Sequence, residues 1–381
     1  MRVLFISPYP PAKDGIGTYT RILAGELRAA GHEIAVAVPR ALGGAAPEVI
    51  GHLGDLPALE REIDRFGPDV VHVQFAVPAF GGRTLAVPRL LDRLAARRVA
   101  PVVATMHEVT RDTELLRGPG RALYRRVVAR TARVTAHTRA ARDLLAGPLG
   151  ARDAVLLPHF STPPPAAVRK PEELRAEHGL GEARLLLMFG FIHMHKGLDD
   201  LVRALRLLID AEPELSADVR LVVAGSVRRR SGVFRVMEAL DHLHHARVRR
   251  LARRLDVSGR ITSTPFVPEG DIAAWFAASE AVVLPYRRAE QSGVANLALA
   301  YGTPVLGTTA GGLSELFAES PWRVPPGRPD LLAEMIADFL RSGARPYIPA
   351  DRSGPQDVSQ TGLEHIARAT LELYRSVIDV R

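Results

Sequence analysis

Residues 280–315 decide the fold, and they read EAVVLPYRRAEQSGVANLALAYGTPVLGTTAGGLSE. The apolar run Ala281–Leu284 has the length and composition of a buried parallel strand. Val294–Tyr301 then predicts a two-turn helix that a glycine ends, and Pro304–Thr308 predicts the next strand. A helix that begins at Ser292–Gly293, on the carboxyl side of a parallel strand, offers unpaired N–H groups and the positive end of its dipole. The stretch therefore predicts a phosphate site.

The composition indicates a globular protein with two domains. The chain has 381 residues, 47% of them hydrophobic and 24% charged, which fits two α/β domains. It has no cysteine, so a disulfide framework and a Cys-ligated metal are excluded. The apolar start MRVLFISPYPP is too short for a signal peptide, and no apolar run reaches the length of a membrane span. We therefore expect a cytoplasmic protein.

The net charge of +8 raises the question of nucleic-acid binding. Only Lys13, Lys170 and Lys196 are lysines, and the arginines accompany many Ala, Gly and Pro residues, as in the proteins of GC-rich bacterial genomes. No basic stripe with interleaved aromatic residues and no nucleic-acid module is visible. We predict no nucleic-acid partner.

The N-terminal segment predicts a βαβ unit of the Rossmann kind. Arg2–Ser7 reads as a buried strand, Thr20–Ala30 as an amphipathic helix and Glu33–Val38 as a second strand. Between the first strand and the helix lie Gly15 and Gly17, which are too few for the dinucleotide-binding fingerprint. Two interpretations stay open: the glycines only tighten a turn, or they let a phosphate group approach the backbone.

His107 follows the predicted strand Val99–Thr105, at the edge of the sheet where open α/β proteins bind ligands. A structural role and a ligand contact are both open for this side chain. The predicted helix Arg121–Ala132, with Arg133 after it, carries arginines at spacings of three and four. A solvated face is the favoured interpretation, and weak peripheral contact with an anionic membrane or an acidic acceptor is the alternative.

The proline-rich stretch Ser161–Arg169 reads as a linker between two domains. After it the pattern restarts, with a predicted strand Leu185–Phe189, a turn at Gly190 and a helix that Lys196 opens. We predict an N-terminal domain of residues 1–165, completed by a C-terminal helix in residues 358–381, and a second domain of residues 166–357.

Several motifs together resemble glycosyltransferase family 4. They are P-x-x-x-D-G-x-G, GHEI, DVVHVQ, VATMHE, LLPH, FGFIHMHKGLDDLVRAL, FVPEGDIAAWFAASEAVVLPYR, QSGVANLALAYGTPVLGTTAGGLSEL and TLELYR. Each is weak alone, but their order and spacing cover the whole chain. The resemblance implies an α/β protein of the GT-B fold, in which two Rossmann-like doubly wound domains face each other across a cleft.

The family resemblance also implies a reaction. A retaining glycosyltransferase moves a sugar from a nucleotide-diphosphate sugar, bound by the second domain, to a hydroxyl acceptor bound by the first. The leaving diphosphate oxygen takes the acceptor's proton, so neither a metal nor a cofactor is required. The implied catalytic residues are His107, Lys196 and Glu290. The implied donor-binding residues are Gly15, Gly17, Gly190, His193, Lys196, Ser292, Gly293, Val294 and Glu315.

One departure from the family pattern matters. Family members commonly have two glutamates seven residues apart, one for the hexose and one for the ribose, and these positions are Ala289 and Leu297 here. Glu290 could replace the first glutamate, and the QSGV wording resembles a branch without the pair. The alternative hypothesis is therefore a non-catalytic GT-B subunit or sugar-nucleotide-binding partner of an active transferase. The acceptor is a natural product, as in antibiotic biosynthesis, or a polysaccharide or lipid-linked saccharide, and the oligomeric state is not predicted.

Overall fold

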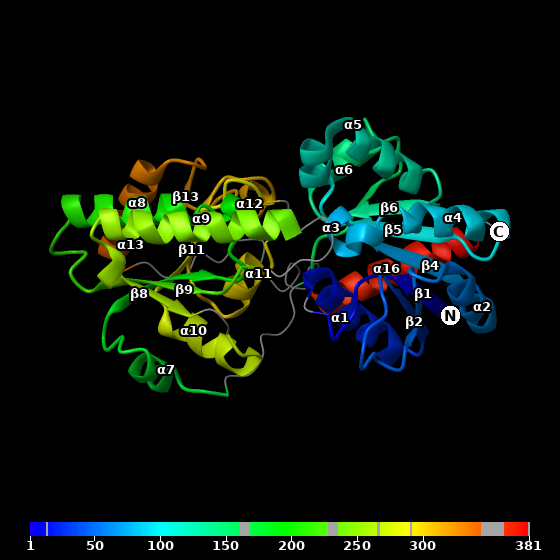
Figure 1. Ribbon diagram of the computed structural model, residues 1–381, viewed down its shortest axis with the longest axis horizontal. Helices are drawn as coiled ribbons and strands as arrows, with labels where there is room; N and C mark the ends of the chain where they lie inside the picture. Colours follow the sequence, from blue (N-terminus) through cyan, green and yellow to red (C-terminus); the bar gives the residue numbers. More distant parts are fainter. Residues whose placement is uncertain are drawn as a thin grey trace. The chain divides into compact units, whose positions relative to one another are not determined.

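The computed structural model describes residues 1–12, 14–160, 168–227, 235–264, 267–289, 292–343 and 362–379. Over these ranges the chain forms two compact α/β units (Figure 1). Unit 1 contains Met1–Phe160 and the C-terminal helix, and unit 2 contains the described residues from 168 to 343. The predicted domain boundaries at 165 and 358, and most of the predicted linker, lie outside the described residues and stay predictions.

Unit 1 is built on a parallel sheet in which seven described strands follow the order β3-β2-β1-β4-β5-β6-β7. The strands are β1 Arg2–Ile6, β2 Glu33–Val38, β3 Val49–His52, β4 Val70–Phe75, β5 Val102–Met106, β6 Arg133–Ala136 and β7 Val155–Leu156. Every residue of β4 and β5 is buried, because helices cover both faces of the sheet.

The helices of unit 1 form two layers. One apolar core lies under α2, α3, α4, α5 and α6, and the other lies under α1 and the C-terminal helix α16. Their bounds are α1 Gly15–Ala29, α2 Leu56–Phe66, α3 Val77–Phe80, α4 Ala86–Ala96, α5 Val109–Val128, α6 Arg139–Ala146 and α16 Leu363–Ile378, with a 3₁₀ turn η1 at Gly81–Arg83. In α5, Arg117 has non-helical backbone angles and marks a kink.

Unit 2 repeats the same architecture. Its six described strands are all parallel and follow the order β10-β9-β8-β11-β12-β13. They are β8 Arg184–Phe189, β9 Val219–Ala224, β10 Ile261–Thr264, β11 Ala281–Leu284, β12 Val305–Thr308 and β13 Arg323–Val324. In both units the strand order reverses once, as in doubly wound Rossmann sheets. The predicted fold of each half is therefore confirmed.

Helices α8, α9 and α13 cover one face of the second sheet, and α7, α10, α11 and α12 cover the other (Figure 1). The helices are α7 Pro171–Glu177, α8 Leu198–Ala211, α9 Arg235–Arg254, α10 Ile272–Ala278, α11 Gly293–Ala300, α12 Gly312–Leu316 and α13 Pro329–Ser342. Three 3₁₀ turns accompany them: η2 Met194–Lys196, η4 Ser258–Arg260 and η5 Glu269–Asp271.

Helix α1 shows where the sequence-based expectation was wrong. It begins at Gly15 and not at Thr20, so both glycines lie in its first turn. Asp14 makes this early start possible, because its carboxylate accepts hydrogen bonds from the backbone N–H groups of Ile16 and Gly17 at 2.9 and 3.2 Å. Such a side-chain cap outweighs the low helix propensity of two glycines.

Candidate active site

The candidate site in unit 2 lies at the point where the strand order reverses. Strands β8 and β11 are neighbours in the sheet, and their following segments run in opposite directions across it. The first segment contains Gly190 and Lys196, and the second leads to the start of α11. Open α/β sheets leave a crevice at such a switch point, outside the carboxyl ends of the strands.

Lys196 lies directly beside the start of α11. A Cβ built on Gly190 would lie 3.3 Å from Lys196 Nζ and 3.3 Å from Val294 Cγ2, so the ammonium group and the first turn of the helix flank this glycine. Lys196 Nζ makes only a long hydrogen bond of 3.5 Å to Phe189 O and lies 4.9 Å from the ring centre of Tyr286. Among the described residues no carboxylate pairs with it. A half-buried cation without a counter-ion favours an anionic ligand.

The start of α11 supplies further donors. Ser292 is the N-cap, and its Oγ accepts a hydrogen bond from the N–H of Ala295 at 3.1 Å. The N–H groups of Gly293 and Val294 have no hydrogen-bond partner in the part of the chain that the structure describes. Together with the dipole of this two-turn helix, they form a backbone site for an anion.

Glycines let the loops at the crevice pack closely. A Cβ on Gly197 would lie 1.9 Å from Pro285 O, so no larger residue fits between the lysine turn and the end of β11. A Cβ on Gly225 would lie 2.0 Å from Gly190 O, which ties the end of β9 to the Gly190 turn. These contacts hold the Lys196 backbone in place before any ligand binds.

An ion-pair network next to Lys196 also connects the two loops. The Arg287 guanidinium donates to Asp200 at 2.7 and 2.9 Å and to Asp199 at 2.7 Å. Burial disfavours the charge on Arg287, but the hydrogen bonds to both aspartates outweigh this effect and raise its pKa. Burial also acts against the Asp199 charge, yet Arg287 and Arg203 lower the pKa of that carboxyl. The sequence does not single out Arg287 or Tyr286, although both directly follow the buried strand β11.

The sequence also predicts His193, Glu315 and Glu290 of unit 2 for the site. His193 precedes η2 and offers its backbone oxygen to the N–H of Lys196 at 2.9 Å. Glu315 is exposed in the first turn of α12. Glu290 lies outside the described residues, so its predicted catalytic role stays a prediction.

The two positions of the common glutamate pair are occupied by packing residues. The Ala289 carbonyl accepts a hydrogen bond from the N–H of Gly312 at 3.0 Å, and a Cβ on Gly311 would lie 1.8 Å from the same oxygen. Leu297 packs against the apolar core beneath α11. Neither side chain offers a hydrogen-bond acceptor for a sugar or ribose hydroxyl.

In unit 1, Gly15 and Gly17 lie at the corresponding switch point, after β1. A Cβ on Gly17 would lie 3.2 Å from the backbone of Pro8, whereas a Cβ on Gly15 would meet open space. Gly17 therefore serves close packing, and Gly15 leaves the start of α1 accessible. The Asp14 carboxylate already occupies the N-cap, and its negative charge disfavours a phosphate group at the N–H groups that it binds.

His107 lies in a buried cluster of histidines at the carboxyl ends of β4, β5 and β6. Its Nε2 donates to Gln74 Oε1 at 2.7 Å, and its Nδ1 lies 3.3 Å from His137 Nε2. His137 Nδ1 in turn donates to Leu157 O at 2.8 Å. When both rings are neutral, the two facing nitrogens carry no proton.

Burial determines the charge state of this cluster. It lowers the pKa of His107 well below the usual value, and it lowers the pKa of His72 and of His137 to about 3. His107 is therefore neutral at pH 7, and it can hydrogen-bond to a ligand but cannot supply a positive charge. The cluster also contains Tyr19, whose ring packs against His107 at 5.2 Å between ring centres.

Helix α5 ends at Val128 and not at Ala132, and several arginines on it and just after it bind other groups. Arg126 and Arg130 both bind Asp92 at 2.7 Å, and Arg125 donates to Pro148 O at 3.0 Å. These contacts agree with the solvated face that the sequence favoured for the helix that carries them. Contact of Arg121–Arg133 with a membrane stays a prediction.

Two units with this strand order, the second with a lysine and a helix N-terminus at its switch point, define a protein of the GT-B class. Comparison with known proteins supports the same class. The model for "Glycosyltransferase Family 4" matches residues 13–160, and the model for "Glycosyl transferases group 1" matches residues 183–342. The chain belongs to glycosyltransferase family 4.

Curated relatives include two proteins named D-inositol 3-phosphate glycosyltransferase. That of Xylanimonas cellulosilytica is 29% identical over 331 residues, which are 79% of this chain and 72% of the relative. That of Pseudarthrobacter chlorophenolicus is 26% identical over 340 residues, with 82% and 71% covered.

Among solved structures, sucrose-phosphate synthase from Thermosynechococcus elongatus has a TM-score of 0.76 at 19% identity, with 100% of both chains covered. Anabaena HepE in complex with UDP and glucose has a TM-score of 0.74 at 17% identity, with 99% of this chain and 100% of that chain covered. These similarities confirm the GT-B fold.

The described residues contain neither a candidate membrane span nor a candidate metal site. No helix there combines the length and the apolar character that a membrane span requires. No group of three or more His, Asp or Glu side chains in the same ranges is arranged to hold a metal ion.

Proposed function

We propose that this protein transfers a sugar from a nucleotide-diphosphate sugar to a hydroxyl group of an acceptor, with retention of the anomeric configuration and without a metal ion. The single observation that carries the proposal is the convergence of Lys196 Nζ with the start of α11 on either side of Gly190. Within the described ranges, this arrangement offers one cation without a carboxylate partner and two N–H groups without an acceptor to one anion. A diphosphate has the charge and the oxygen acceptors to use all three.

The proposed chemistry follows from that site. As the bond between the anomeric carbon and the diphosphate oxygen breaks, negative charge develops on the diphosphate. Lys196 and the N–H groups of Gly293 and Val294 would stabilise this charge, and because they are already in place, they need no reorganisation. The acceptor oxygen then bonds to the anomeric carbon on the same face, and its proton passes to the leaving diphosphate oxygen. We propose Glu290 and neutral His107 as hydrogen-bonding groups for the transferred sugar.

Similar proteins support the donor class and suggest acceptors. HepE structures contain UDP and UDP-glucose, which supports a nucleotide-diphosphate sugar as the donor. Curated relatives are named for D-inositol 3-phosphate, so a phosphorylated polyol joins natural products and lipid-linked saccharides as an acceptor to test. We propose that the protein acts in the cytoplasm, as its sequence predicts.

A donor panel tests the proposal. Purified protein is incubated with nucleotide-diphosphate sugars of each base, with D-inositol 3-phosphate, lipid-linked saccharides or water as acceptor, and released nucleoside diphosphate is measured. We expect release with one base class, and NMR of the product should show the anomeric configuration of the donor. An inverted product would contradict retention. If no donor is turned over while nucleoside diphosphates still bind, the alternative of a non-catalytic partner subunit replaces the proposal.

A further inference from the structure

Helix α9 is the most exposed long helix on the described surface of unit 2. Only Asp241, Val248 and Ala252 are buried among its 20 residues. Their spacings of seven and four place them on one side of the helix, which faces α8 and the sheet. The remaining circumference of α9 is left to solvent or to a binding partner.

A continuous stripe runs along the outer side of α9. Its members follow one another at spacings of four and three residues, so they lie on one helical face. The stripe consists of Val236, Leu240, Leu243, Arg247, Arg250 and Arg254. Its first half is apolar, with exposed fractions of 66%, 48% and 55% for the three aliphatic side chains. Its second half is made of three exposed arginines.

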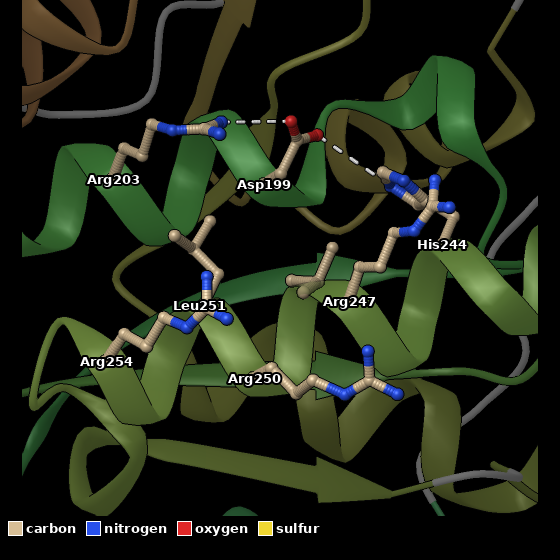
Figure 2. Close-up of a pocket in the computed structure, with 8 residues that line it drawn as sticks. Asp199, Arg203, His244, Arg247, Arg250, Leu251 and Arg254 are labelled. Carbon is tan, nitrogen blue, oxygen red and sulfur yellow. Dashed lines mark hydrogen bonds and ion pairs between the residues drawn. The ribbon is translucent and has the colours of Figure 1, made fainter.

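The arginine half borders a cavity of about 330 Å³ between α8 and α9 (Figure 2). Arg203 of α8 joins the three arginines in the lining, together with Asp199 and His244. Asp199 does not neutralise the arginines of α9, because it already binds Arg203 at 3.0 Å and Arg287 at 2.7 Å.

Within the described residues, Arg247, Arg250 and Arg254 form no ion pair. They differ in this respect from Arg126 of α5 and from Arg130 just after that helix, which share Asp92. The cavity therefore has the excess positive charge that a phosphate group requires.

We propose that the outer stripe of α9 binds unit 2 to the surface of an anionic lipid bilayer. The aliphatic half would enter the boundary between headgroups and acyl chains, and the arginines with their cavity would bind lipid phosphates. Exposed aliphatic side chains next to basic ones, on a helix with a low overall hydrophobicity, are typical of helices that bind at a membrane surface without spanning it.

The apolar half of the stripe favours a bilayer over other anionic partners. Nucleic acid would pair with Arg247, Arg250 and Arg254 but would leave Val236, Leu240 and Leu243 against a charged surface or in water. A bilayer satisfies both halves, because its headgroup layer is charged and the layer beneath it is apolar. The proposal does not depend on the reaction that the protein catalyses.

Vesicle co-sedimentation of the full chain tests the proposal. We expect binding to vesicles that contain phosphatidylglycerol, weaker binding to phosphatidylcholine alone, and a decrease with added salt. The R247A/R250A/R254A variant should lose about tenfold or more in affinity for the anionic vesicles. L240S/L243S should weaken binding as well and should keep the salt dependence of the wild type.

A matched control removes three arginines elsewhere. R121A/R125A/R126A on α5 has the same change in net charge, and its vesicle affinity should stay within about twofold of the wild type. All replaced side chains on α9 are exposed, so circular dichroism and thermal unfolding should match the wild type. The proposal is overturned if the wild type does not bind anionic vesicles, or if the two triple variants lose affinity equally. It is also overturned if L240S/L243S binds like the wild type, because polyanion attraction alone would then explain binding.

Discussion

Lys196→Ala should separate catalysis from stability. In the free protein the Lys196 ammonium group contributes little to the free energy of unfolding. Its hydrogen bond to Phe189 O is 3.5 Å long, and its contact with the Tyr286 ring is worth about 0.5–1 kcal/mol. In the transition state the same group would stabilise developing diphosphate charge, and loss of one such donor costs about 2.7–4 kcal/mol. We therefore expect kcat/KM to fall about 100- to 1,000-fold, while the melting temperature falls by about 2–4 °C or less.

Initial rates of nucleoside diphosphate release and thermal unfolding measure the two effects on the same preparations. Lys170→Ala is the matched control, since it removes another lysine of unit 2 that precedes α7 and is exposed. Its kcat/KM should equal that of the wild type. Lys196→Arg keeps the charge and should recover part of the activity. A Lys196→Ala variant whose kcat/KM stays within tenfold of the wild type would remove this lysine from the mechanism.

Three further perturbations test packing, buried charge and pH. Gly197→Ala should lower the free energy of unfolding by about 2–4 kcal/mol, because the new Cβ would lie 1.9 Å from a backbone carbonyl oxygen, as denaturant titration can measure. Arg287→Met should cost about 3 kcal/mol in the same assay, since it leaves the buried Asp200 carboxylate with only the longer ion pair to Arg203 at 3.7 Å. The third concerns His72 and His137, whose folded-state pKa of about 3 lies below the unfolded value of about 6.5. The unfolded state then binds more protons, so stability present above pH 6.5 is lost as the pH falls, by about 1.4 kcal/mol per pH unit and histidine.

Each of these predictions has a control or an opposing outcome. Gly181→Ala has a positive φ of 47° but open space for its Cβ, so it should cost about 1 kcal/mol, and an equal loss in Gly197→Ala would contradict the packing argument. Arg203→Met removes a half-exposed ion pair and should cost about 1 kcal/mol or less. A free energy of unfolding that stays constant between pH 7 and pH 5 would show that the buried imidazoles are not held neutral.

Strands of both units could be predicted closely from the sequence, because buried parallel strands are short apolar runs between polar turns. Strands β2 and β11 have the predicted bounds. Helices with a weak apolar face could not be predicted in the same way. Helix α9 begins at Arg235, but so few of its residues are buried that its first half shows no core-facing period in the sequence.

The site could be predicted only in part. The switch point and the start of α11 follow from the order of strands, turns and glycines in residues 280–315. The approach of both Lys196 and Val294 to Gly190 depends on β8 and β11 being neighbours in the sheet, which no local pattern specifies. The network of Arg287 with Asp200 joins residues far apart in the sequence and has no local signature at all.

The most direct test of the central claim is a calorimetric titration of the wild type and Lys196→Ala with a nucleoside diphosphate and with the matching nucleoside. The base is the one selected by the donor panel. The account predicts that the diphosphate binds the wild type at least about tenfold more tightly than the nucleoside, and that most of this advantage disappears in the variant. Equal affinity of the wild type for both ligands, or an undiminished advantage in Lys196→Ala, would contradict a diphosphate site between Lys196 and the start of α11.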